Sequence, residues 1–162
     1  MKILSIDPGF EKVGWAVFDK TGTSSTDFTF ITSDIIKTSK ALLHELRLKL
    51  IYQTLNEIIK KHKIKQLVIE KLFFFKNKKT VLEVSQAVGV IELSASLMNI
   101  PISRLTPLQI KHIITGYGTA DKESVQKMIK LELGDQIVFK DDDESDAIAC
   151  GLAYCYQNEG LD

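Results

Sequence analysis

Short apolar runs, each closed by a turn signal, open this chain of 162 residues. They predict strands over Lys2–Asp7, Val13–Phe18 and Asp27–Thr32, with Pro8-Gly9 and Thr21-Gly22 as turns. Three sequential strands joined in this way favour an antiparallel meander.

Helical spacing then replaces the short runs. Ser39 is the expected N-cap of a helix that reaches about Lys63, in which leucines and isoleucines recur every three or four residues. The remaining pattern predicts a strand over Gln66–Glu70, a helix over Lys79–Met98, a strand over Pro101–Leu105 and a helix from Thr106-Pro107, followed by helices over Asp121–Leu131 and Glu144–Gln157. A meander followed by β-α units indicates one α/β domain over residues 1–162, with a mixed five-stranded sheet and helices on both faces.

Two segments carry small residues. The helix over Lys79–Met98 is rich in serine, alanine and glycine, which suits tight packing on the sheet and a subunit interface equally. Gly116-Tyr117-Gly118 is interpreted as a flexible joint before the next helix.

Composition narrows the class of protein. Hydrophobic residues make up 44% of the chain and charged residues 26%, as in one soluble globular domain, which argues against disorder and collagen. No apolar run is as long as a membrane span, and Asp7 comes too early in the chain for a signal peptide. We therefore expect a cytoplasmic protein that is not associated with a membrane. Cys150 and Cys155, five residues apart in a predicted helix, are expected to be buried thiols rather than a disulfide.

The charges balance in number but not in distribution. The segment 60–79 contains eight lysines and one acid, and the segment 135–146 contains six acids and one lysine. The first segment is suited to phosphate and the second to cations, although both are also compatible with ordinary solvated surface charge.

Four carboxylates lie where predicted elements end or begin. Asp7 and Glu70 end two strands, and in α/β sheets the crevice beyond strand ends is the usual place for chemistry. Asp143 and Asp146 are three residues apart at the head of the last helix and share one face, although helix capping alone also explains acids there. Converging carboxylates bind hard cations such as Mg²⁺. A pair of such ions roughly 3.5–4 Å apart promotes phosphodiester hydrolysis.

Ordered motifs across nearly the whole chain resemble the RuvC family of Holliday-junction resolvases. They are Ile6-Asp7-Pro8-Gly9, Val13-Gly14-Trp15-Ala16-Val17, Ile69-Glu70 with Phe73 and Lys76-Asn77, Ser85-Gln86-Ala87-Val88-Gly89-Val90, Gln109-Ile110-Lys111, Gly116-Tyr117-Gly118-Thr119-Ala120-Asp121-Lys122 and Asp143-Glu144-Ser145-Asp146-Ala147-Ile148-Ala149. Each motif alone is only weak support for this family, but the ordered set is specific.

The resemblance implies an RNase H-like fold, a homodimer, and cleavage of four-way DNA junctions by paired symmetric nicks with 5′-phosphate ends. By position it implies that Asp7, Glu70, Asp143 and Asp146 bind two Mg²⁺ ions per active site, with Mn²⁺ as a substitute, and it suggests a branch-migration helicase as a further partner. The extra acids around the last motif leave Asp142 as an alternative to Asp143.

The resemblance also implies DNA-binding residues. Phe73 takes the place of an aromatic residue that stacks on a junction base, and Phe74 or Phe75 is an alternative because the three rings adjoin; a core strand extension is the structural alternative for the run. Lys76 flanks this run, and Lys111 and Lys122 match phosphate-binding positions. Phosphate contacts of this kind predict binding that weakens steeply with salt.

Three other functions remain as alternatives. A nuclease of the same fold acting on other branched DNA or on RNA–DNA hybrids is the main competitor. A junction-binding module that does not cut would use the acids only as caps. An actin-like ATPase is suggested by Ile6-Asp7-Pro8-Gly9 alone and conflicts with the length, because such proteins need a second lobe.

Overall fold

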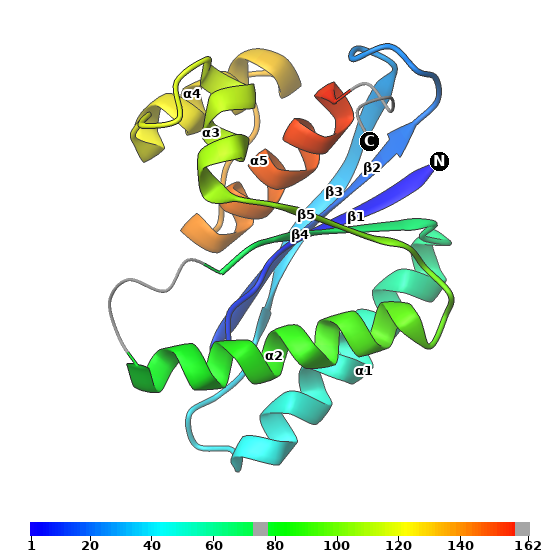
Figure 1. The fold of residues 1–162 in the computed structure, drawn as a ribbon, viewed down its shortest axis with the longest axis vertical. Coiled ribbons are helices and arrows are strands. Elements are labelled where there is room, and N and C mark those ends of the chain that lie inside the picture. Colours follow the sequence, from blue (N-terminus) through cyan, green and yellow to red (C-terminus); the bar gives the residue numbers. More distant parts are fainter. Residues whose placement is uncertain (73–77, 158–162) are drawn as a thin grey trace.

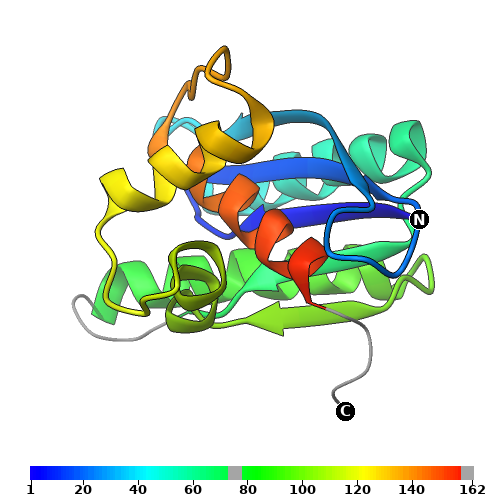
Figure 2. The same ribbon diagram turned by 90° about the horizontal axis from the view of Figure 1, so that it is seen from above.

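A five-stranded mixed sheet runs through the molecule and carries helices on both faces (Figures 1 and 2). The computed structural model describes residues 1–72 and 78–157. The strands are β1 (Lys2–Asp7), β2 (Lys12–Lys20), β3 (Phe28–Lys37), β4 (Gln66–Glu70) and β5 (Ile102–Leu105), in the sheet order β3-β2-β1-β4-β5. The first three are antiparallel and β1, β4 and β5 are parallel, which confirms the predicted meander followed by crossovers.

Helices cover both faces of the sheet and form a separate core layer with each face (Figure 1). The helices are α1 (His44–His62), α2 (Lys78–Ser96), α3 (Pro107–Thr115), α4 (Lys122–Leu133) and α5 (Asp142–Tyr156). Helices α1 and α2 pack together under the sheet, while α5 lies across β1 and β2 on the other face and supports α3 and α4. None of the helices in the described part of the chain has the length and hydropathy that a membrane crossing requires.

Three sequence predictions are wrong in detail. The third strand continues to Lys37 because residues 33–37 pair with the start of β2, and their mixed polarity hid this edge strand. Helix α1 begins at His44 rather than after Ser39, whose hydroxyl accepts a hydrogen bond from the Ala41 amide in the preceding loop. The segment around Tyr117 is a hydrogen-bonded turn rather than a loose joint, because the Thr115 hydroxyl accepts a hydrogen bond from the Tyr117 amide.

Alternation along β1 divides the core into two layers. Leu4 and Ile6 face α1 and α2, whereas Ile3 and Ser5 face α5. Because successive side chains of a strand point to opposite faces, Asp7 must lie on the same side as Ser5 and α5. The strand pattern therefore fixes the face on which this acid is displayed.

Helix α5 approaches the sheet unusually closely. The buried Ser5 hydroxyl donates a 2.7 Å hydrogen bond to the Ala147 carbonyl oxygen of α5. A Cβ atom on Gly151 would lie 2.2 Å from the Phe18 ring and 2.6 Å from the Ser5 hydroxyl oxygen. Cys150 and Cys155 on this helix are buried free thiols, as predicted.

This packing predicts that Gly151→Ala destabilises the fold. The added methyl group meets the Phe18 ring and the Ser5 hydroxyl, which are fully buried and have no space to move into, so we expect a loss of about 1–3 kcal/mol in the free energy of unfolding. Gly89→Ala is the matched control, since a Cβ there meets nothing within 4 Å and alanine favours the helix by about 0.5–1 kcal/mol. Urea denaturation of both variants measures the difference, and equal stabilities would contradict the close packing of α5.

Candidate active site

Asp7 and Glu70 stand side by side at the ends of two parallel strands. The register pairs Ile6 with Ile69, which brings the next residue of each strand to the same level. Val68 faces the core layer of α5, so Glu70, two residues later, faces that layer as well. Strand alternation and register therefore deliver both carboxylates to one place, as the sequence predicted.

Asp143 and Asp146 reach the same place from the first turns of α5. The N-cap of this helix is Asp141, whose carboxylate accepts a hydrogen bond from the Asp143 amide at 3.4 Å. Because Asp141 fulfils the capping role, capping does not account for Asp143 and Asp146. These two carboxylates are left available for the site.

Gly14 allows the start of α5 to come this close. It pairs with Asp7 across β1 and β2, and a Cβ atom on it would lie 1.8 Å from the Asp143 carbonyl oxygen. Any side chain at this position would push the first turn of α5 away from Asp7. Gly14 belongs to one of the sequence motifs, but this role could not be predicted from the sequence, because the contact joins segments far apart in the chain.

Two further contacts hold the beginning of α5. The buried Glu144 carboxylate accepts hydrogen bonds from the Ser33 hydroxyl at 2.7 Å and from the Lys140 amide at 2.6 Å. Lys12 of β2 forms a 2.5 Å ion pair with Asp141. Sequence reasoning missed these anchors because Glu144 lies in an acidic run that is typical of a solvated surface.

The carboxylates form one electrostatic cluster. Burial is the main reason that the pKa of Asp7 lies well above its ordinary value. The negative charges of Glu70, Asp146 and Asp143 raise this pKa further, while Lys122 lowers it. Burial and the neighbouring Asp141 likewise raise the pKa of Asp143.

Glu70 is the second strongly perturbed acid. Burial raises its pKa to about 7, with a further contribution from Asp146, whereas Lys111 and Lys122 act in the opposite direction. Among the described residues, no hydrogen bond or ion pair reaches the carboxylate of Glu70 or of Asp7. Burying carboxylates without partners is unfavourable unless a cation compensates their charge.

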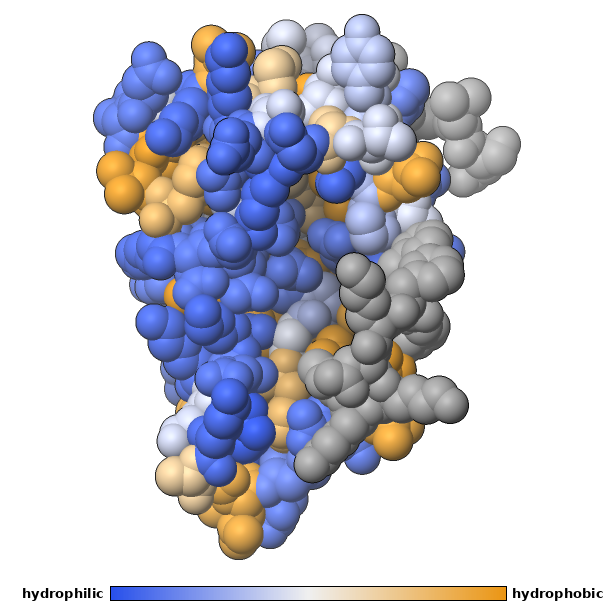
Figure 3. Space-filling model, turned by 90° about the vertical axis from the view of Figure 1, so that its left-hand side faces the viewer, coloured by the Kyte–Doolittle hydropathy of each residue, from blue (hydrophilic) through white to orange (hydrophobic). Residues whose placement is uncertain are grey.

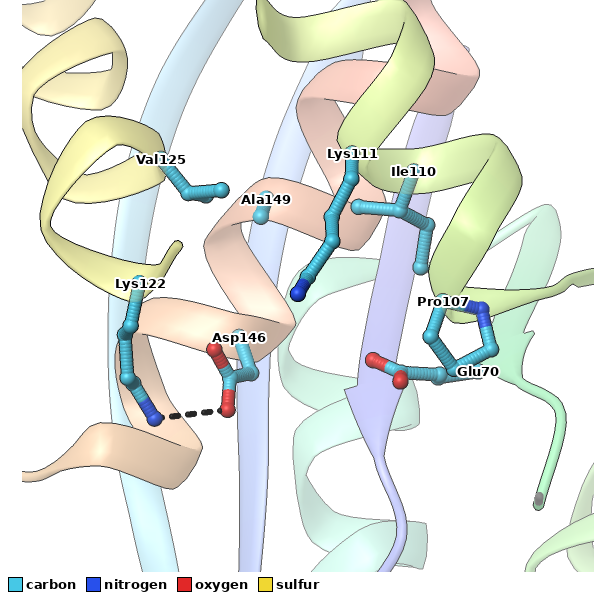
Figure 4. A pocket seen from close by; sticks show the side chains of 8 residues that line it. All are labelled: Glu70, Pro107, Ile110, Lys111, Lys122, Val125, Asp146 and Ala149. Atoms are coloured by element: carbon cyan, nitrogen blue, oxygen red, sulfur yellow. Dashed lines mark hydrogen bonds and ion pairs between the residues drawn. The ribbon is translucent and has the colours of Figure 1, made fainter. Parts of the chain in front are cut away.

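Two lysines line the hollow next to these acids (Figure 4). The hollow has a volume of about 180 Å³ and includes Glu70, Lys111, Lys122 and Asp146 in its wall. Lys122 Nζ lies 2.9 Å from an Asp146 oxygen and 3.4 Å from Asp142, and Lys111 points between the carboxylates of Asp146 and Glu70. The structure thus brings together both lysines that the sequence singled out.

Asp142 is the weaker of the two alternatives at the last motif. Its side chain is 71% exposed, and its ion pair is with Lys122. Asp143, in contrast, acts electrostatically on Asp7. This arrangement favours Asp143 as the residue that belongs to the cluster.

The donor set suits a hard divalent cation that keeps part of its water shell. Across the described residues, no three His, Cys, Asp or Glu side chains are gathered closely enough to enclose an ion by themselves. Mg²⁺ does not require such a cage, since it is commonly held by one or two carboxylates together with waters and substrate phosphates. Buried, unpaired carboxylates on Asp7 and Glu70 fit that mode of binding.

Figure 3 shows the side of the molecule that lies at the left in Figure 1. Hydrophilic side chains predominate across it, between apolar groups at its upper and lower ends. Phe73, Phe74 and Lys76, the other residues predicted to bind DNA, lie outside the described residues, as does Phe75.

The sheet order β3-β2-β1-β4-β5, with acids at the ends of β1 and β4 and on α5, defines an RNase H-like protein. The family model described as "Crossover junction endodeoxyribonuclease RuvC" matches residues 3–155. The chain belongs to the RuvC family.

Curated relatives that carry the name of this family match the chain over nearly its full length. The protein of Thermosipho melanesiensis is 41% identical over 155 residues, covering 96% of both chains. That of Fusobacterium nucleatum is 41% identical and covers 95% of this chain and 80% of its own. The solved structure of Thermus thermophilus RuvC in complex with a Holliday junction substrate superposes with a TM-score of 0.87 at 24% identity, covering 96% of this chain and 93% of that one, which confirms the fold.

The raised pKa of Glu70 predicts a pH-dependent stability gain in Glu70→Gln. Below the ordinary pKa of 4.5, the carboxyl group is neutral in both the folded and unfolded states and costs nothing; as the pH rises through about 7, the folded state loses stability because it must bury a charge. Without divalent ions, we expect the variant to be more stable by about 1–3 kcal/mol at pH 8. Thermal unfolding between pH 4 and pH 8 measures this.

Glu57→Gln, on the exposed face of α1, is the control and should show no such trend. A Glu70→Gln gain that stays constant from pH 4 to pH 8 would contradict the assigned burial of this charge.

Proposed function

We propose that this protein is a crossover junction endodeoxyribonuclease that resolves four-way DNA junctions by paired nicks with 5′-phosphate ends. Membership of the RuvC family supports this proposal, since the family and the relatives from Thermosipho melanesiensis and Fusobacterium nucleatum carry that activity in their name. The observation that carries it is the convergence of Asp7, Glu70 and Asp146 beside Lys111 and Lys122.

We assign the four carboxylates Asp7, Glu70, Asp143 and Asp146 as the metal ligands and catalytic residues. When bound, two Mg²⁺ ions, or Mn²⁺ in their place, would lower the pKa of an attacking water and stabilise the leaving oxygen. Asp7 and Glu70 contribute oxygens from a rigid sheet, and Asp143 and Asp146 contribute theirs from α5. The burial of Asp7 and Glu70 strengthens their interaction with a cation.

In the free protein, the positive charge of Lys122 partly offsets the negative charge of the carboxylates. Its ammonium group is bonded to Asp146, and this bond and the negative charge of Asp146 raise its pKa against the opposing effect of burial. In the complex, we expect Lys122 and Lys111 to turn towards the scissile phosphate, where each donates hydrogen bonds to non-bridging oxygens. Lys122 thereby exchanges a carboxylate for a phosphate partner.

The remaining DNA contacts stay predictions from the sequence. Phe73, or Phe74, would stack on a base at the crossover, and Lys76 would neutralise a nearby phosphate. The expected location remains the cytoplasm, and residues 1–162 are taken as one nuclease domain. A branch-migration helicase remains a suggested partner.

A homodimer suits a symmetric junction, because two copies place two active sites on opposed strands. The outward face of α2 supports such an assembly. Leu82 and Leu93 are more than half exposed on it, and Leu97, directly after the helix, is also more than half exposed. We therefore propose α2 as part of the contact between the two copies.

Two alternative functions are less well supported. A module that binds junctions without cutting would use the acids only as caps, but Asp141 already performs that role in α5. No feature of the described residues favours other branched DNA or RNA–DNA hybrids over a four-way junction. A substrate comparison therefore belongs in the test.

A cleavage assay on an immobile four-way junction tests the proposal. With Mg²⁺, we expect paired ligatable nicks in opposed strands, lost on addition of EDTA. Asp7→Asn should lower the rate by at least about 10²-fold while retaining junction binding, since this change removes one metal ligand and leaves the lysines in place. Duplex, flap and RNA–DNA hybrid substrates of equal length serve as controls.

Binding without cutting in Mg²⁺ or Mn²⁺ would contradict the catalytic assignment. Faster cleavage of hybrids or flaps than of the junction would contradict the proposed substrate.

A further inference from the structure

Tyr117 lies in the turn between α3 and α4 and has no role in the site described above. Its side chain is 74% exposed, and it is the only exposed aromatic residue in the part of the chain that the structure describes. No ring contact or hydrogen bond of its side chain with another described residue is present. Single exposed apolar residues are common on proteins, so exposure alone does not indicate a function for Tyr117, and its surroundings must be considered.

The backbone of the turn is held in place. The Thr115 hydroxyl accepts a 3.1 Å hydrogen bond from the Tyr117 amide and lies 2.8 Å from the Lys111 carbonyl oxygen, to which it donates. The Ala120 amide donates to the Tyr117 carbonyl oxygen at 3.1 Å. Gly116 supplies the left-handed conformation, with φ of 80°, that ends α3 at this point.

The turn is also bounded and packed. Asp121 caps α4 by accepting a 2.8 Å hydrogen bond from the Ser124 amide. Gly118 packs so tightly against Leu108 that a Cβ atom there would lie 3.1 Å from the leucine side chain. Because the backbone that carries the ring is already ordered, only the side chain has to become ordered when a ligand binds, which favours affinity.

Both ends of the turn lead to the lysines of the active-site hollow. Lys111 lies one helical turn before Thr115 on α3, and Lys122 is the first residue of α4. Both line the hollow together with Glu70 and Asp146. Tyr117 therefore lies on the turn that joins the two helices whose lysines line the hollow, which, under the proposed function, receives the scissile phosphate.

A strand whose phosphate lies between these lysines continues with its neighbouring sugars and bases past the segments that carry the lysines, and the turn with Tyr117 connects those segments. Every base presents a flat π-face, and an exposed aromatic ring on an ordered backbone binds such a face without regard to sequence. The contact releases no counterions, in contrast to a lysine on a phosphate.

We propose that Tyr117 stacks on an unpaired base of the substrate strand next to the phosphate held by Lys111 and Lys122. This inference rests on the proposed function, since it needs a nucleic-acid strand in the hollow. The ring supplies the interaction, because the hydroxyl group has no assigned partner. Tyr117 is thus a positioning residue that holds the cleaved strand in register with the carboxylates.

The test uses full-length protein carrying Asp7→Asn to prevent cleavage, and a four-way junction with 2-aminopurine beside the expected nick. Tyr117→Ala should raise the Kd about 5- to 150-fold, the range measured for loss of one base stack, without changing the slope of log Kd against log salt. Tyr117→Phe should bind within about twofold of the parent and quench 2-aminopurine equally. Lys111→Gln should instead reduce the salt slope by about one.

Leu131→Ala, an exposed apolar residue at the far end of α4, is the matched control and should change neither affinity nor quenching. An unchanged Kd in Tyr117→Ala, or 2-aminopurine fluorescence that is the same in all variants, would overturn the stacking proposal. If the Asp7→Asn parent still binds the junction, such a result leaves the proposed function intact. A parent protein that does not bind the junction would instead contradict the proposed function itself. Equal losses in Tyr117→Phe and Tyr117→Ala would show that the hydroxyl group, not the ring, makes the contact.

Discussion

The close approach of α5 to the sheet is the constraint on which the rest of the site depends. Gly14 and Gly151 remove side chains at the two points where the helix and the sheet come nearest, and Ser5 bonds the helix backbone between them. This contact places Asp143 and Asp146 within electrostatic reach of Asp7. If α5 were one side-chain layer further away, the strands would still form, but the carboxylates would not act together.

Holding these acids together works against the stability of the free protein. Burial and mutual repulsion raise the pKa values of Asp7 and Glu70. Keeping these groups charged at neutral pH therefore lowers the stability of the folded state. Lys122 relieves some of that cost through Asp146. Bound cations would relieve the rest, and the same burial that is unfavourable without them would strengthen their binding. The site is therefore prepared for a ligand whose charge is opposite to its own.

Much of the fold followed from local patterns. Short apolar runs predicted strands that end in Asp7 and Glu70, and the three-residue spacing of Asp143 and Asp146 predicted a shared helix face. Family resemblance then linked these separate acids to one kind of chemistry, and the family is confirmed. Boundaries were less predictable, because the continuation of β3 depends on pairing with β2 and not on its own residues.

The supporting contacts of the site were beyond sequence reasoning. Gly14 meets Asp143 across more than a hundred residues of chain, and Glu144 is buried only because Ser33 and the Lys140 amide satisfy its oxygens. Such contacts depend on the folded geometry, whereas the reactive side chains can be recognised in the sequence by their residue type and position. Tyr117 shows the same limit, since its exposure and its fixed backbone are properties of the turn and not of the Gly-Tyr-Gly letters.

Anomalous diffraction from crystals of the protein soaked in Mn²⁺ tests the central claim most directly, because it locates the ions independently of any cleavage. The account predicts two Mn²⁺ ions at the ends of β1 and β4, ligated by oxygens of Asp7, Glu70, Asp143 and Asp146, with Lys122 displaced from Asp146. Ions bound instead to Asp142 or at unrelated surface acids, with the four carboxylates free, would contradict it.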